Sequence, residues 1–82
     1  MTNEILNPFS ETAQNLKRGI YSHYSGRLYE VVGVARHSES LEEMVVYQAQ
    51  YGEKDIWVRP LSMFVESLEI KGVMTPRFRL IK

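Results

Sequence analysis

The spacing of apolar residues along the chain changes once, at about residue 19. Before that point, five apolar residues recur at helical spacing: Ile5, Leu6, Phe9, Ala13 and Leu16. Ser10 is a residue type that caps helices, so a short helix is predicted from Ser10 to about Arg18. A helix of this length is unstable alone. Residues 1–18 are therefore expected to be either flexible or docked on an apolar surface.

From Gly19 onward, apolar and polar residues alternate with a period of two, as in half-buried strands. Strands are predicted at residues 19–24, 27–37, 44–51, 56–59 and 65–70, with a terminal strand at 77–81. Ser25-Gly26 is a hairpin turn signal, and Pro60 ends the fourth strand because proline cannot donate to the ladder. The pattern predicts one mostly-β domain over residues 19–82, preceded by the separate segment 1–18.

Turn lengths give an expected register for the hairpin around Gly52. If Tyr51 lies opposite Ile56, then Gln50 faces Trp57 and Gln48 faces Arg59. Positions 45, 47, 49, 56 and 58 would then share a buried face, and the other face would carry Gln48, Gln50, Trp57 and Arg59. Similar reasoning sets Ile20 opposite Val31 in the first hairpin.

Gly33 interrupts a long β-branched strand. With Ala35 opposite Val45, Gly33 lies opposite Tyr47, so either a ring covers the glycine or the glycine marks a bulge. The same register places an apolar patch on the outer face: Val32, Val34, Met44 and Val46. Such a patch is expected to be covered by the N-terminal segment or by a second copy. A sheet apolar on both sides favours strong curling into a small barrel of five to six antiparallel strands.

Composition narrows the classes of function. The chain has 82 residues, ten Lys plus Arg against ten Asp plus Glu, and no cysteine, so disulfide scaffolds and thiolate metal sites are excluded. Zero net charge disfavours a dedicated duplex-DNA binder. Uncharged runs are much shorter than the roughly 20 residues that span a bilayer, and the N-terminus lacks the basic region of a signal peptide. No membrane association and a cytoplasmic location are expected.

Four motifs stand in order along the chain, "GVARHSE", "VVY", "WVRP" and "PRF". On these motifs the segment from Gly19 to Ile81 resembles a small bacterial family of unknown function. The resemblance implies a small barrel similar to SH3-type barrels. It implies no established activity, substrate or cofactor.

The most promising recognition surface is built around Trp57 and Arg59, because tryptophan and arginine are frequent interface anchors. In the expected register Gln48 and Gln50 flank this pair, and the end of the second strand adds Arg36 and His37. Alternatively, Trp57 is buried under the N-terminal segment or the last strand. Five tyrosines, at 21, 24, 29, 47 and 51, suggest an aromatic groove, although alternating tyrosines are also ordinary strand formers.

These residues support three functions. The leading one is a non-catalytic binding module for a protein, a peptide or a second copy, which would make a homodimer. The runner-up is nucleic-acid or nucleotide binding through the arginines and aromatic rings. The third is a small enzyme or metal-dependent factor that uses His37 with Glu39, Glu42 and Glu43, but these residues also fit a solvated loop. No catalytic residue, metal ligand or cofactor is therefore predicted.

Overall fold

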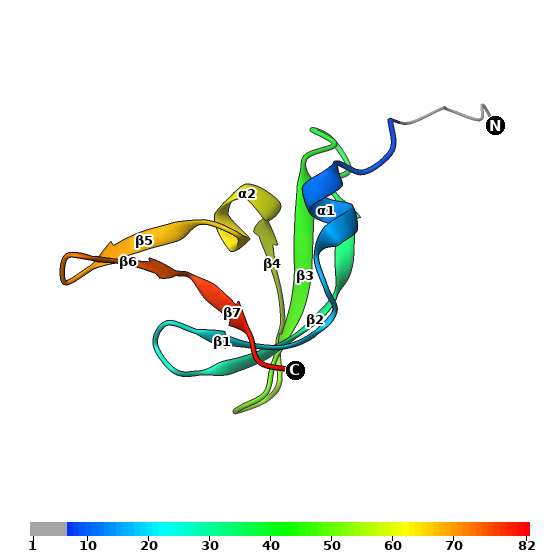
Figure 1. Cartoon of the computed structure of the whole chain (residues 1–82). Coiled ribbons are helices and arrows are strands. Elements are labelled where there is room, and N and C mark those ends of the chain that lie inside the picture. Colours follow the sequence, from blue (N-terminus) through cyan, green and yellow to red (C-terminus); the bar gives the residue numbers. More distant parts are fainter. Residues whose placement is uncertain (1–6) are drawn as a thin grey trace.

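The computed structural model describes residues 7–82, which form seven strands and two short helices (Figure 1). The elements follow in the order α1 (Glu11–Asn15), β1 (Gly19–His23), β2 (Leu28–Arg36), β3 (Glu43–Ala49), β4 (Ile56–Pro60), α2 (Leu61–Phe64), β5 (Ser67–Ile70), β6 (Val73–Pro76) and β7 (Phe78–Leu80). The prediction of a mostly-β fold with a short N-terminal helix is confirmed. The structure has one more strand than predicted. The additional strand is β6, which pairs with β5, whereas β7 pairs with β1.

Five strands form one antiparallel sheet in the order β4-β3-β2-β1-β7, and β5 pairs with β6 in a separate ribbon. In Figure 1 this ribbon (orange) extends away from β2 and β3. Strands β4 and β7 are the two edges of the large sheet and do not pair with each other within residues 7–82. A closed, SH3-like barrel therefore stays a prediction.

The core lies against one face of the large sheet, which we call the inner face, and contains eight clustered buried side chains: Ala13, Tyr21, Val31, Val45, Tyr47, Leu61, Phe64 and Phe78. Phe64 of α2 stacks on Phe78 of β7, with ring centroids 4.1 Å apart and planes inclined by 8°. Tyr21 and Tyr47 each meet the Phe64 ring at a centroid distance of 5.5 Å. Pro60 ends β4 directly before α2, and this break brings Leu61 and Phe64 over the sheet.

The N-terminal helix is docked on this core. The Ser10 hydroxyl caps α1 by accepting a hydrogen bond from the Ala13 N–H at 3.1 Å, as its residue type predicts. The Glu43 carboxylate on β3 in turn accepts hydrogen bonds from the Ser10 N–H and hydroxyl, both at 2.7 Å. The helix ends at Asn15 rather than near Arg18, because Leu16 is extended. Predicted helix positions Ile5 and Leu6 lie outside the described residues.

The register predicted for the β3–β4 hairpin is wrong. Tyr47 lies opposite Trp57, and Val46 lies opposite Val58. The turn is wider than predicted, because both Gly52 and Lys54 adopt left-handed conformations with φ of 58° and 56°. The resulting shift is an odd number of residues, which exchanges the two faces of β4. Consequently Ile56 and Val58 are 64% and 60% exposed on the outer face instead of buried.

The other two predicted registers are also wrong: the first by one residue, and the second by one residue from Gly33 onward and by two before it. Ile20 lies opposite Glu30 instead of Val31, because a three-residue loop (residues 24–26, with Gly26 at φ 99°) replaces the two-residue turn and sets His23 opposite Arg27. Val34, not Ala35, lies opposite Val45. The bulge interpretation of Gly33 is confirmed, since the ladder shifts between Val31 and Gly33.

The predicted apolar patch is therefore divided between the two faces. Val34 packs against the core, whereas Val32 is 46% exposed. The N-terminal helix does not cover the outer face, because Ala13 belongs to the core cluster on the inner face. The prediction that Val32, Val34, Met44 and Val46 form one covered surface is wrong. The outer face instead exposes Val32, Ile56 and Val58.

Candidate binding site

Trp57 and Arg59 reach the inner face at the open edge of the sheet, where they border a pocket of about 240 Å³. The other walls are Tyr29 from β2, Tyr47 from β3 and Tyr51 from the loop between β3 and β4. Trp57 remains 51% exposed, so its indole is accessible to a ligand. We call these five residues the aromatic pocket.

The tyrosine hydroxyls of the aromatic pocket are held by hydrogen bonds. The hydroxyls of Tyr29 and Tyr51 lie 2.6 Å apart, and the Tyr29 ring meets those of Tyr47 and Tyr51 edge to face at 5.3 and 5.5 Å. The Arg59 Nε donates to the Tyr47 hydroxyl at 3.2 Å. The Arg27 guanidinium lies over the Tyr51 ring at 4.5 Å. The walls are therefore preorganised, which lowers the entropic cost of binding a ligand.

The electrostatics of the pocket combine protonated phenols with two cations. Burial, reinforced by the hydrogen bond to Tyr51, raises the pKa of Tyr29 to about 12. Hydrogen bonds from Tyr29 and Arg27 lower the pKa of Tyr51 from its ordinary value. Either hydroxyl can be the donor in the Tyr29–Tyr51 hydrogen bond. The single ion pair within residues 7–82 joins Arg77 to Glu66, so neither Arg27 nor Arg59 is neutralised by a carboxylate there.

The structure does not bring the other four predicted site residues to this pocket. The Arg36 guanidinium donates to the Asn7 carbonyl and lies 4.1 Å above the Phe9 ring, at the far end of β2. His37 follows it in a loop, where its Nδ1 accepts from the backbone N–H groups of Glu39 and Ser40. These contacts tie the N-terminal segment and the loop in place.

Gln48 and Gln50 are engaged in the turn between β3 and β4. The Gln48 side chain donates to the Lys54 carbonyl at 3.0 Å, and the Gln50 side chain donates to the Gln48 carbonyl at 3.2 Å. Gln48 also pairs with the outward-facing Ile56, so it points away from the aromatic pocket. Only Trp57 and Arg59 of the six predicted binding residues therefore share one site.

Sequence reasoning misses three wall residues and one rim residue as members of this site: Tyr29, Tyr47, Tyr51 and Arg27. The tyrosines are groove candidates by residue type. The predicted register, however, places Tyr47 and Trp57 on different faces of the sheet, whereas in the structure they share one face. The repeated tyrosines in both hairpins are the available signal. A correct register would join that signal to Trp57.

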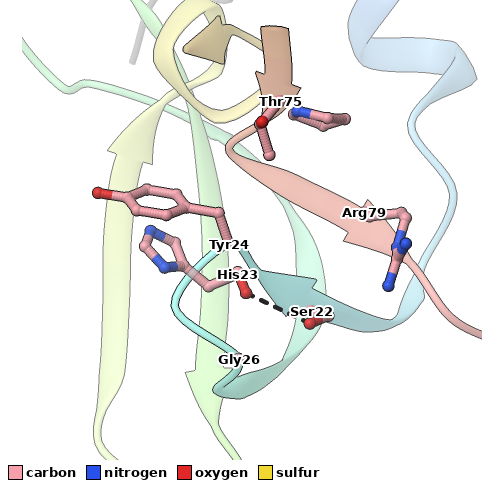
Figure 2. A pocket seen from close by; sticks show the side chains of 7 residues that line it. Ser22, His23, Tyr24, Gly26, Thr75 and Arg79 are labelled. Atoms are coloured by element: carbon pink, nitrogen blue, oxygen red, sulfur yellow. Dashed lines mark hydrogen bonds between the residues drawn. The ribbon is translucent and has the colours of Figure 1, made fainter. Parts of the chain in front are cut away.

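A second cavity, of about 330 Å³, lies between the tip of the β1–β2 hairpin and strands β6 and β7 (Figure 2). The Nδ1 of His23 accepts a hydrogen bond from the Ser25 N–H at 3.2 Å. Burial, together with nearby Arg59 and Arg77, lowers the pKa of His23. Figure 2 shows the rings of His23 and Tyr24 on one side and Arg79 on the other, so the polar groups do not converge on one point. This cavity is larger than the aromatic pocket but less organised.

The polar loop around His37 does not assemble a metal site. Nowhere in residues 7–82 do three His, Cys, Asp or Glu side chains lie together in a group that could hold a metal ion. Glu43, one of the candidate carboxylates, is bonded to Ser10. Within the same range, neither helix is long and apolar enough to cross a membrane.

The fold and the pocket together define a small antiparallel β domain with an aromatic pocket at the edge of its large sheet. The chain belongs to the family described as a protein of unknown function, DUF1653, whose members' pattern matches residues 19–80. This confirms the resemblance to a family of unknown function. The crystal structure of a DUF1653 protein from Bordetella bronchiseptica is similar, with a TM-score of 0.78 and 31% identity over 84% of this chain and 91% of the other. No curated protein matches the chain.

Proposed function

We propose that this protein is a non-catalytic binding module and that the aromatic pocket is its ligand site. The observation that supports this proposal is a half-exposed tryptophan in the wall of a preorganised pocket made with three tyrosines. Exposing an indole to water forgoes its hydrophobic stabilisation. Tryptophan, tyrosine and arginine are also the residue types that dominate binding energy at protein interfaces.

The pocket suits a protein or peptide segment that combines an apolar or planar side chain with a carboxylate. The four rings offer stacking and edge contacts for the side chain. Arg59 uses only its Nε for the Tyr47 hydroxyl, which leaves its terminal nitrogens to form a bidentate bond with a carboxylate. Domains that bind extended peptides through aromatic grooves use the same kinds of group.

A second candidate ligand is a nucleotide or single-stranded nucleic acid. The specific observation in its favour is that Arg27 and Arg59, neither ion-paired within residues 7–82, flank exposed rings on which a base can stack. The zero net charge of the chain argues for the peptide, because nucleic-acid affinity comes mainly from phosphate neutralisation.

The chemistry of the pocket favours recognition over turnover. Its polar atoms are phenol hydroxyls and guanidinium groups, and the pKa of Tyr29 at about 12 makes that phenol a poor base near neutral pH. No nucleophile with an adjacent base lines it.

Intrinsic fluorescence tests the proposal directly, because Trp57 is the only tryptophan in the chain. We expect peptides that carry both aromatic and acidic residues to change the Trp57 emission in a saturable titration. Arg59→Ala should weaken the binding of such a peptide by about tenfold or more. Ile56→Ala, on the opposite face of the same strand, is the matched control and should bind like the wild type.

A panel of single-stranded oligonucleotides, titrated at several salt concentrations, distinguishes the two ligand classes. Salt-sensitive binding of oligonucleotides with no binding of peptides would favour the second candidate. If neither class changes the emission, or if Arg59→Ala and Ile56→Ala behave alike, the aromatic pocket is not the binding site.

A further inference from the structure

The two edges of the large sheet differ in how they are protected. Strand β7 has three residues, lies between the cations Arg77 and Lys82, and carries Arg79. Strand β4 has five residues, and its three successive apolar side chains are exposed: Ile56, Trp57 and Val58. Sheet proteins usually protect such an edge with charges, a bulge or a covering segment. Strand β4 has Pro60 at its end and a single charge, Arg59.

The backbone of β4 has hydrogen-bonding groups directed away from the sheet. The Ala49 N–H donates to the Asp55 carbonyl at 3.0 Å, which marks this opposed pair as hydrogen-bonded. Since such pairs alternate along an antiparallel ladder, Trp57 also directs its N–H and C=O groups to β3. Ile56 and Val58 therefore direct theirs to the open side, where the described chain provides no strand.

The sequence of this edge is complementary to itself when reversed. In "DIWVR", residues 55–59, an antiparallel copy centred on Trp57 places Asp55 opposite Arg59 and Ile56 opposite Val58. Residues directly opposite in a ladder share a face, so the two charge pairs form on the inner face and the apolar pairs on the outer face. Within residues 7–82 neither Asp55 nor Arg59 has an ion-pair partner.

We propose that two copies of this chain associate through β4, in antiparallel register about Trp57, to form one continuous sheet. Each Ile56 exchanges its two backbone hydrogen bonds with Val58 of the other copy, and each Asp55 pairs with the other copy's Arg59. The two Trp57 rings meet at the symmetry axis. Because the formal net charge of the chain is zero, the copies do not repel one another strongly.

The interface is expected to be concentration-dependent rather than permanent. One short strand from each copy buries less surface than the roughly 1,600 Å² of a standard interface. The two aromatic pockets lie on the same face of the continuous sheet, one on each side of the axis. This inference does not require the proposed ligand function, but a ligand carboxylate and Asp55 of the other copy would compete for the same Arg59 guanidinium.

Sedimentation equilibrium of the full chain over a concentration series, up to about 1 mM, tests the association. Asp55→Arg alone should set two guanidinium groups opposite each other in each cross-strand pair, and Arg59→Asp alone should set two carboxylates opposite each other. Each substitution should raise the dimer dissociation constant by about tenfold or more. An equimolar mixture of the two variants should restore association, because both cross-strand pairs are then opposite in sign.

A second pair of variants covers the case in which Arg59→Asp fails to fold, since Arg59 also contacts Tyr47. Val58→Lys adds a charge at the edge and should abolish association. Val32→Lys adds the same charge to the outer face away from the edge, at a residue 46% exposed, and should leave association unchanged.

A wild-type chain that stays monomeric throughout the series overturns the inference. So does a dimer that is equally stable in the charge variants and their mixture, or one that Val32→Lys disrupts as much as Val58→Lys. Fluorescence titration of ligands at concentrations where the chain is monomeric tests the pocket separately, so the two proposals fail independently.

Discussion

Strands β3 and β4 pair with each other and have similar apolar residues, yet these side chains are buried in β3 and exposed in β4. Val45, Tyr47 and Ala49 of β3 are 0%, 4% and 1% exposed, whereas Ile56, Trp57 and Val58 of β4 are all more than half exposed. Strand β3 has a strand on each side, and its inner face is covered by Phe64 and Phe78. Within residues 7–82, strand β4 has a neighbouring strand on one side only.

The comparison shows that position in the sheet, not residue type, decides whether an apolar side chain of these two strands is buried or exposed. The same residue types that stabilise the fold in β3 remain available for contacts in β4. Since a domain of this size has a free energy of unfolding of only about 5–15 kcal/mol, substitutions in the two strands should differ greatly in effect.

The largest expected difference is between Val45→Asp and Val58→Asp. An unpaired carboxylate at the fully buried Val45 position costs several kcal/mol, so this variant should be unfolded at room temperature. Val58→Asp, at a position 60% exposed, should fold with a melting temperature near that of the wild type. Circular dichroism melts of both variants check this prediction, and a cooperative, wild-type melt for Val45→Asp would contradict the assigned core.

Replacing an aromatic residue by alanine should also lower the free energy of unfolding more in the core than in β4, but the difference should be smaller than for the aspartate variants. Phe64→Ala removes a 1%-exposed ring stacked on Phe78 and should lower the free energy of unfolding by about 3–5 kcal/mol. Trp57→Ala should cost about 1 kcal/mol or less, because its ring is already half exposed. Urea denaturation measures both values, and equal losses would show that Trp57 is part of the core.

Alkaline titration examines the hydrogen bond between Tyr29 of β2 and Tyr51 in the loop that connects β3 to β4. Because the folded-state pKa of Tyr29 is raised from 10.0 to about 12, the folded chain retains a proton that the unfolded chain loses. This contribution to stability is complete below pH 10.0 and is lost as the pH rises toward about 12. Tyr51→Phe should lower the pKa of Tyr29 by removing its hydrogen-bond partner, while the effect of burial remains. Tyrosinate absorbance reads out this change, and an unchanged titration would show that the Tyr29–Tyr51 bond does not form.

The smallest effect is expected at the start of β3, where Glu43 holds Ser10. The hydrogen bonds from Ser10 lower the pKa of the Glu43 carboxyl from 4.5. A depressed folded-state pKa gives stability that is present above the unfolded pKa and is lost as the pH falls through the folded value. The difference in melting temperature between wild type and Glu43→Gln should therefore shrink between neutral pH and about pH 3. A difference that stays constant over this range would mean that Glu43 does not bind Ser10.

Several features can be predicted from local patterns. Alternation identifies the strands, including the buried series Val45, Tyr47 and Ala49, because strands expose alternate faces. Ser10 is recognisable as a helix cap because its hydroxyl satisfies a free N–H of the first turn. Trp57 and Arg59 are recognisable as candidate site residues because their types favour recognition. None of these inferences needs to know which strands are neighbours.

The faces of β4 and the composition of the pocket cannot be predicted in this way. Register depends on turn geometry, and the left-handed conformation of Lys54 has no signal in its residue type, unlike that of Gly52. A shift by an odd number of residues then moves every side chain of β4 to the other face. The error separates Trp57 from Tyr47 and groups it instead with Gln48 and Gln50.

The sequence by itself therefore determined the mostly-β class, the family, the helix cap and the central core residues, because each depends on local residue type or period. Only the tertiary structure decided that β4 is an edge, that Val58 is exposed and that four aromatic residues meet beside Arg59. These features depend on strand order and on the conformation of one turn. Both are set by the packing of the whole sheet and not by local residue type.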